Sequence, residues 1–146
     1  MSKEYFHNET KAFEHLEKIL WNGNPVCPKC GALDRIYTLE GVKDKIGRVR
    51  FGLKKCGHCK SQFTVRVGTV FESAHITLSK CLQAVYLMCS SKKGISAHQM
   101  HRTLEITYKS AWFLCHRIRE AMRDGTLVPM GGAGSVVEVD ETNIGR

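Results

Sequence analysis

The 146-residue sequence predicts an α+β protein assembled from small modules. Three observations support this class. Apolar residues recur every three to four positions near the N-terminus and again in the second half, which is typical of amphipathic helices. Between them, short runs alternate polar and apolar residues and are separated by glycines, as in strands. Two Cys-x-x-Cys pairs lie in that β-type region. We therefore expect a helix, a small β-type ribbon and then three helices.

The expected modules follow the changes in pattern along the chain. The N-terminal amphipathic helix belongs to residues 1–24, the ribbon to 25–73 and a helix-turn-helix unit to 76–125. A flexible Gly-containing linker is expected over 126–135, and an apolar strand begins the segment 136–146.

The first helix is expected over residues 9–20. Phe13, Leu16, Ile19 and Leu20 share one face, and Asn22-Gly23-Asn24-Pro25 ends the helix. In the ribbon, the alternation of residues 48–51 and 62–67 predicts two strands.

Three helices are expected after the ribbon, over residues 78–91, 97–104 and about 107–123. Ser96 and Gln99 have the spacing of a capping box at the start of the second of these helices. The third carries an apolar stripe formed by Ala111, Leu114, Cys115, Ile118 and Met122.

The Cys-x-x-Cys pairs predict a metal site. Two residues between cysteines let both sulfurs of a tight turn reach one ion, and Gly31 and Gly57 are expected to supply a positive φ there. Two such knuckles form a tetrahedral four-thiolate cage that suits structural Zn²⁺. The expected ligands are Cys27, Cys30, Cys56 and Cys59.

Other interpretations of the cysteines stay open. An iron site of rubredoxin type uses a similar cage, and two unrelated thiol pairs are the simplest alternative. His58, inside the second knuckle, is expected to be a turn residue. Cys81, Cys89 and Cys115 are expected to be buried as small apolar side chains.

The composition indicates which class of partner the protein binds. Lysine and arginine exceed aspartate and glutamate by 22 to 14, a net charge of +8, which favours a polyanionic partner. No apolar run is long enough for a membrane helix, and no signal-peptide core is visible near the N-terminus. We expect a cytoplasmic protein with reduced thiols and no membrane partner.

Basic residues concentrate in two places. Residues 43–60 hold seven Lys and Arg against one Asp, and an alternating strand there could track a phosphate backbone. The residues expected to bind DNA in this stretch are Arg48, Arg50, Lys54 and Lys55. A charged face that is merely solvated is the alternative.

The second basic stretch is helical, over residues 92–123. A short helix, a turn at 105–107 and a longer helix form a helix-turn-helix, whose second helix enters the major groove with its N-terminal residues first. The expected DNA contacts here are Thr107, Tyr108, Lys109, Ser110 and Arg117. A plain three-helix bundle is the alternative, and Trp112 is expected in the core.

The order of these motifs resembles the N-terminal part of bacterial insertion-sequence transposases with a zinc-ribbon head. The resemblance rests on both knuckles, on the run from Gln62 to Glu72, on the helical stretches at 95–104 and 107–122, and on Val137-Glu138-Val139-Asp140-Glu141-Thr142. In that family, a ribonuclease-H-like domain with a DDE carboxylate set follows the head.

The resemblance implies that the head binds double-stranded DNA at transposon ends and that the full-length protein acts as an oligomer on DNA. Asp140 matches the first catalytic carboxylate, which helps to hold Mg²⁺ in a full-length catalytic form. Only Glu141 follows it as an acid, and Asn143 stands where the family usually has an aromatic residue. We therefore expect a chain that stops at the start of its catalytic domain and is inactive alone.

Two other classes of function stay open. A working enzyme would need the remaining catalytic domain in trans or through a frameshift. A small zinc-ribbon and helix-turn-helix regulator would bind DNA, or an RNA polymerase, without any chemistry. The apolar strand at 136–139 argues against this regulator, because a free-standing regulator has no sheet for it.

Overall fold

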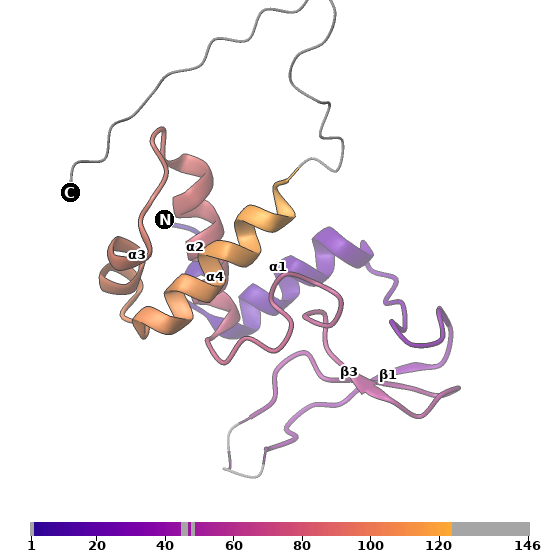
Figure 1. Ribbon diagram of the computed structural model, residues 1–146. Coiled ribbons are helices and arrows are strands. Elements are labelled where there is room, and N and C mark those ends of the chain that lie inside the picture. Colours follow the sequence, from indigo (N-terminus) through magenta and orange to yellow (C-terminus); the bar gives the residue numbers. More distant parts are fainter. Residues whose placement is uncertain (1, 45–46, 48, 124–146) are drawn as a thin grey trace, which may run out of the picture.

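The computed structural model describes residues 2–44, 47 and 49–123 (Figure 1). These residues form an α+β fold, as predicted. The N-terminal part contains the 3₁₀ turn η1 (Glu4–Phe6) and helix α1 (Glu9–Trp21). A small sheet follows, and three helices complete the described chain. The strands are β1 (Ile36–Thr38), β2 (Lys54–Cys56) and β3 (Gln62–Phe63); the helices are α2 (Leu78–Ser90), α3 (Ala97–Leu104) and α4 (Tyr108–Ala121).

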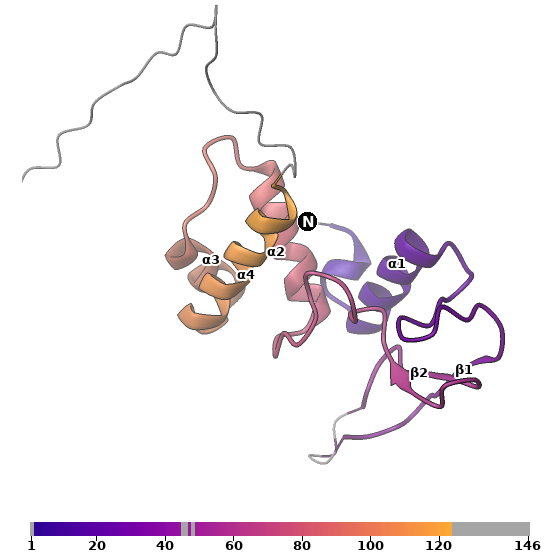
Figure 2. The same cartoon turned by 45° about the vertical axis from the view of Figure 1, so that its right-hand side comes forward.

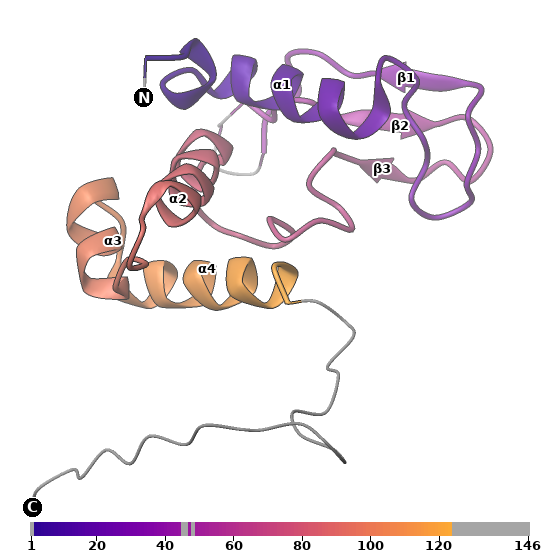
Figure 3. The same cartoon turned by 90° about the horizontal axis from the view of Figure 1, so that it is seen from above.

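The helices surround α2. Figure 3 shows α1 and α4 on opposite sides of α2, with α3 next to the N-terminal end of α4. The sheet and α3 lie at opposite ends of the molecule, as Figure 2 also shows. In the described part of the chain, no helix is both long and apolar enough to span a membrane.

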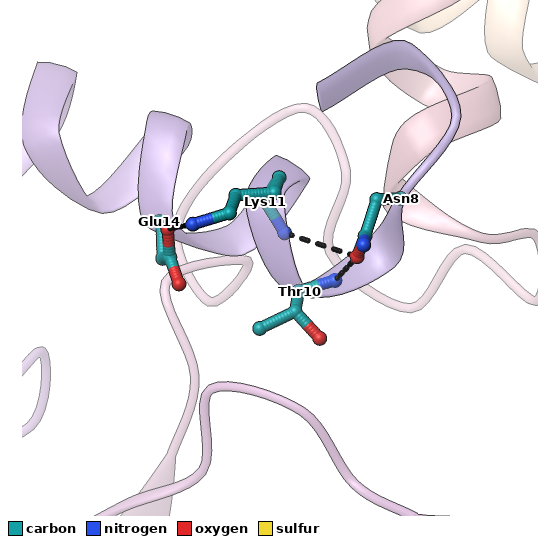
Figure 4. A network of polar contacts seen from close by, with 4 residues as sticks. All are labelled: Asn8, Thr10, Lys11 and Glu14. Atoms are coloured by element: carbon teal, nitrogen blue, oxygen red, sulfur yellow. Dashed lines mark hydrogen bonds and ion pairs between the residues drawn. The ribbon is translucent and has the colours of Figure 1, made fainter. Parts of the chain in front are cut away.

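Helix α1 begins at a side-chain cap. Asn8 Oδ1 accepts hydrogen bonds from the amides of Thr10 and Lys11, at 3.0 and 3.4 Å (Figure 4). These bonds satisfy two of the amides that have no partner within the helix. One turn later, Lys11 Nζ lies 2.9 Å from Glu14 Oε2 on the solvent side. A local sequence signal therefore fixes where this helix starts.

The buried face of α1 differs from the predicted one near its C-terminal end. Phe13 and Leu16 are buried, but Ile19 is 62% exposed and Leu20 is also exposed. Trp21 turns inward instead and packs edge-on against Phe63 of β3, with ring centroids 6.0 Å apart. The prediction was wrong for the last turn of α1, because Trp21, rather than Ile19 or Leu20, packs against both apolar cores.

The sheet is antiparallel in the order β1-β2-β3. The strand predicted over 48–51 was wrong for its described residues, because Val49 makes only an isolated bridge to Lys43. The strand predicted over 62–67 ends at Phe63, since Val67 donates its amide to the carbonyl of Thr64 in a turn. In the described residues, neither segment therefore forms the full strand that its alternating pattern predicts.

One core joins the N-terminal helix to the three later helices. Ala12, Phe13 and Leu16 of α1 share it with apolar residues from the ribbon and from α2, α3 and α4. Cys81 and Cys115 are buried in it as predicted, whereas Cys89 is exposed. Met122 is also exposed, because α4 ends at Ala121. The N-terminal helix and the three later helices thus share one core.

A carboxylate from α1 caps α2. Thr77 precedes this helix but makes no side-chain cap. Glu9 supplies it instead: its two carboxylate oxygens accept from the amides of Leu78 and Ser79, at 2.7 and 3.0 Å. A negative charge at a helix N-terminus also interacts favourably with the positive end of the helix dipole. The contact ties the two helices together across 69 residues of sequence.

Arginines hold the segment between β3 and α2. The guanidinium of Arg66 donates to the carbonyls of Phe71, Ala74 and Ile76, at 3.2, 2.7 and 3.2 Å. Arg117 of α4 donates to the carbonyl of Glu72 in the same segment. Arg66 and Arg117 therefore hold the backbone of this segment in place, a role that a count of basic residues does not reveal.

Candidate metal centre and basic surfaces

The first cysteine knuckle is a closed turn. Gly31 donates its amide to the carbonyl of Cys27 at 2.9 Å, and Cys27 donates to the carbonyl of Ala32 at 3.0 Å. Gly31 has φ +70°, as predicted. An L side chain rarely adopts this conformation, so the turn favours glycine at this position.

The second knuckle closes in the same way but uses its glycine differently. Cys56 donates to the carbonyl of Ser61 at 3.0 Å, and the positive φ of +58° belongs to Lys60. The prediction of a positive φ at Gly57 was therefore wrong. Gly57 is needed for space, because a Cβ there would lie 2.8 Å from the Cβ of Arg35.

The two knuckles bring four sulfurs together. Cys27 lies before β1, Cys56 ends β2, and all four Sγ atoms lie within 4.8 Å of one another. The Sγ atoms of Cys27 and Cys59 are 3.6 Å apart, and those of Cys30 and Cys56 are also 3.6 Å apart. A tetrahedron with zinc–sulfur bonds of about 2.3 Å has edges of about 3.8 Å, so the arrangement fits Zn²⁺.

Hydrogen bonds around the sulfurs suit thiolates. The Ser61 hydroxyl, 2.8 Å from Cys59 Sγ, and the Ser61 amide lower the pKa of the Cys59 thiol to about 6. The pKa of Cys27 is lowered although burial opposes ionisation, because backbone amides of the knuckle donate to its sulfur. The amide of Ala32 favours ionisation of Cys30, but neighbouring thiols raise its pKa to about 12. A bound cation would remove this competition among the sulfurs.

The comparison with known families agrees with this geometry. Residues 7–62 match the family model described as the transposase zinc-ribbon domain. This part of the chain is similar to the zinc ribbons of transposases. The matched range includes helix α1 and all four cysteines. Neither a curated protein nor a solved structure matches the chain.

Helix α1 is part of the zinc ribbon's packing. Cys27, Cys56 and Phe63 form a small second core, against which Trp21 packs from the end of α1. Near the cysteines, His58 Nε2 lies 3.0 Å from Asp34 Oδ1 and is not one of the four clustered ligands. The expectation that His58 is a turn residue agrees with this position.

Lys54 differs from the other predicted DNA contacts of the zinc ribbon. It is only 8% exposed, its Nζ lies 3.1 Å from Glu17 Oε2, and it lies over the ring of Trp21. Lys54 is therefore not presented at the surface as Lys55 is, because on β2 its side chain faces α1. Lys55, the next residue, points the other way and is exposed.

The remaining predicted ribbon contacts lie at the surface or outside the described residues. Arg50 is exposed, and its amide donates to the carbonyl of Val42 at 2.8 Å. Arg48 lies outside the described residues. The exposed basic face of the described zinc ribbon therefore includes Arg50 and Lys55.

The start of α4 presents most of the other predicted contacts. Thr107 is the N-cap: its Oγ1 accepts from the amide of Ser110 at 3.2 Å and donates to the Ser110 hydroxyl. Tyr108 is partly exposed and stacks on His98 of α3, with centroids 4.3 Å apart. Lys109 is exposed. Both hydroxyls are thus engaged in capping, while the Lys109 amine extends from the same turn.

Two aromatic residues of α4 are more exposed than the sequence pattern indicates. Trp112, expected in the core, is 44% exposed, because the buried stripe is formed by its neighbours Ala111, Leu114 and Cys115. Phe113 is 55% exposed and touches Trp112 edge-on. Nothing in the sequence around Trp112 distinguishes its exposed position from the buried position of Ala111 beside it.

The expected first catalytic carboxylate, Asp140, lies outside the described residues.

Proposed function

We propose that this chain is the DNA-binding N-terminal portion of an insertion-sequence transposase and that it recognises transposon-end DNA. The match of residues 7–62 to the transposase zinc-ribbon domain carries the proposal. The clustering of the four sulfurs supports the zinc-ribbon part of this proposal, because four thiolates at these distances suit Zn²⁺.

Zinc acts on DNA binding through the position of β2. Cys56 ends β2, and Lys55 precedes it on the exposed face. A metal that fixes Cys56 therefore fixes the direction of Lys55. Together with Arg50, this places cationic side chains on one module, where they can pair with phosphates.

Helix α4 supplies the second contact. Helices α3 and α4 are joined by a short turn, and Glu105, the residue that follows α3, has the left-handed conformation. A short turn between two helices supports a helix-turn-helix unit, whose second helix would read the major groove. Lys109 is placed to reach phosphates or base edges, whereas Thr107 and Ser110 mainly hold the first turn in shape.

Strand cleavage and joining would belong to a carboxylate set of which Asp140 is the expected first member, with Mg²⁺ as the ion that stabilises the attacking and leaving oxygens. DNA binding by the described residues does not depend on that set. The transposase activity of a full-length form therefore stays a separate proposal.

The experiment compares two duplexes bound by the zinc-loaded chain. One carries the terminal sequence of the DNA element that encodes it, and the other carries the same bases in scrambled order. We expect tighter binding to the terminal sequence by about tenfold or more, as for specific sites. Lys109→Ala should reduce this preference, whereas Lys29→Ala, an exposed lysine in the first knuckle, serves as the matched control. Equal affinity for both duplexes would refute end recognition.

A further inference from the structure

A pocket of about 620 Å³ lies between residues 70–76 and helix α4. Figure 3 shows the segment that joins β3 to α2 passing alongside α4. Most of the pocket wall is apolar, and the side chains that form it include Val70, Ile76, Phe113 and Leu114. Its volume lies within the range of about 300–1,000 Å³ that is typical of small-molecule sites.

The wall opposite α4 is held in place before any ligand arrives. Arg66 donates to three carbonyls of this segment, including those of Ala74 and Ile76, which line the pocket. Arg117 reaches across from α4 to the carbonyl of Glu72. Such contacts reduce the ordering cost that a ligand would otherwise meet on binding.

The polar part of the pocket carries positive charge. Lys109 and Arg117 line it from α4, and both are exposed. Its described lining residues include no aspartate or glutamate. The chemistry therefore favours an occupant with a flat apolar part and an anionic group.

We propose that this pocket receives one unpaired nucleotide of the bound DNA, an inference that rests on the proposed DNA-binding function. The Phe113 ring offers a stacking surface for the base, and Lys109 offers a charge for its phosphate. A paired base cannot enter, because it is stacked on both faces within the duplex. The pocket thus distinguishes distorted or single-stranded DNA from an intact duplex.

The test uses three short duplexes of otherwise identical sequence. One is fully paired, one has a single unpaired adenine, and one has an abasic residue in place of that adenine. We expect the unpaired adenine to increase affinity by about fivefold or more over the abasic duplex, the lower end of a base–aromatic stack. Equal affinities for the adenine and abasic duplexes would overturn the proposal.

Substitutions distinguish base stacking in this pocket from stacking on exposed aromatic rings elsewhere. Phe113→Ala should abolish the preference for the adenine, Phe113→Tyr should keep it, and Tyr37→Ala, which removes an exposed ring on β1, should leave it unchanged. A preference that survives Phe113→Ala would overturn the proposal. The proposal would also be overturned if sedimentation showed that the native chain self-associates and that Phe113→Ala does not, because the pocket would then bind a second copy of the chain. Failure to bind even the paired duplex would instead refute the proposed function.

Discussion

Lys54 Nζ lies 3.1 Å from Glu17 Oε2, in a contact that joins strand β2 to helix α1. The neighbouring Lys55 faces solvent. Two adjacent lysines of one strand therefore have different surroundings: Lys54 supports the packing of α1 on the zinc ribbon, whereas Lys55 is exposed, as its proposed DNA contact requires.

Alanine substitutions should separate these roles. Lys54→Ala should lower the free energy of unfolding by about 1–3 kcal/mol, because it leaves the Glu17 carboxylate partly buried without its partner. Lys55→Ala should leave unfolding almost unchanged but reduce the salt dependence of DNA binding by about 0.9 in logarithmic slope, the share of one phosphate contact. Urea unfolding and a salt series of DNA titrations check the pair. Equal effects of both variants on DNA binding would contradict this division.

The cap that Glu9 provides to α2 should be measurable. Glu9→Ala leaves the amides of Leu78 and Ser79 without their acceptor, and we expect a loss of about 1–2 kcal/mol. Glu14→Ala is the control, since its pair with Lys11 is exposed and its loss should leave stability almost unchanged. Urea denaturation of the zinc-loaded protein gives both values. If the two variants unfold at the same urea concentration, the cap has no stabilising role.

Gly52 packs against helix α1. It has φ +60°, and a Cβ built there would lie 2.5 Å from Cδ1 of Phe13. Gly52→Ala should therefore destabilise the protein by about 2–4 kcal/mol, from overpacking and backbone strain together. Gly41→Ala, at φ +69° with no atom within 4 Å of the added methyl, isolates the strain. Thermal unfolding should place the Gly41 variant between the native chain and the Gly52 variant; the reverse order would contradict the contact.

The thiols outside the metal centre should differ in reactivity. Burial raises the pKa of Cys81 to about 11 and also raises that of Cys115, whereas Cys89 is exposed. In the zinc-loaded chain, a thiol reagent at neutral pH should therefore modify Cys89 first, and Cys89→Ser should remove the fast phase. Rapid modification of Cys81 in the folded chain would show that α2 is less buried than the structure indicates.

The same burial gives stability a dependence on alkaline pH. The folded Cys81 thiol has a pKa of about 11, above the ordinary value of 9.0, so the folded state holds this proton more tightly. Its contribution is complete below pH 9.0 and is lost as the pH rises towards 11. A Cys81→Ala variant should show less of this alkaline loss in urea titrations. An identical pH profile in both proteins would contradict the assignment.

The sequence predicted those features that depend on neighbouring residues. The Cys-x-x-Cys spacing identified the four cysteines whose sulfurs cluster, and apolar periodicity located the helices to within about two residues. Ser96, as half of its capping box, does accept from the amide of Gln99. The strand predicted over 48–51 was wrong because polar and apolar residues also alternate in loops, and such a segment forms a strand only when it pairs with a neighbouring strand.

Features that join distant segments were not predictable in this way. Nothing local indicates that Glu9 will cap a helix 69 residues later, or that Arg66 will bind backbone rather than solvent. The inward turn of Lys54 depends on which face of β2 meets α1. Each arises from tertiary packing, which a periodicity within one element cannot show.

The most direct test of the account is the affinity of the chain for duplex DNA before and after a chelator removes zinc. We expect one Zn²⁺ per chain, loss of most DNA affinity on its removal, and recovery when zinc is restored, because the ribbon that carries Arg50 and Lys55 folds around the metal. Cys56→Ser should behave as the zinc-free chain, and Cys89→Ser as the native one. DNA affinity that is unchanged without zinc would contradict the central claim that the zinc ribbon is a DNA-binding module.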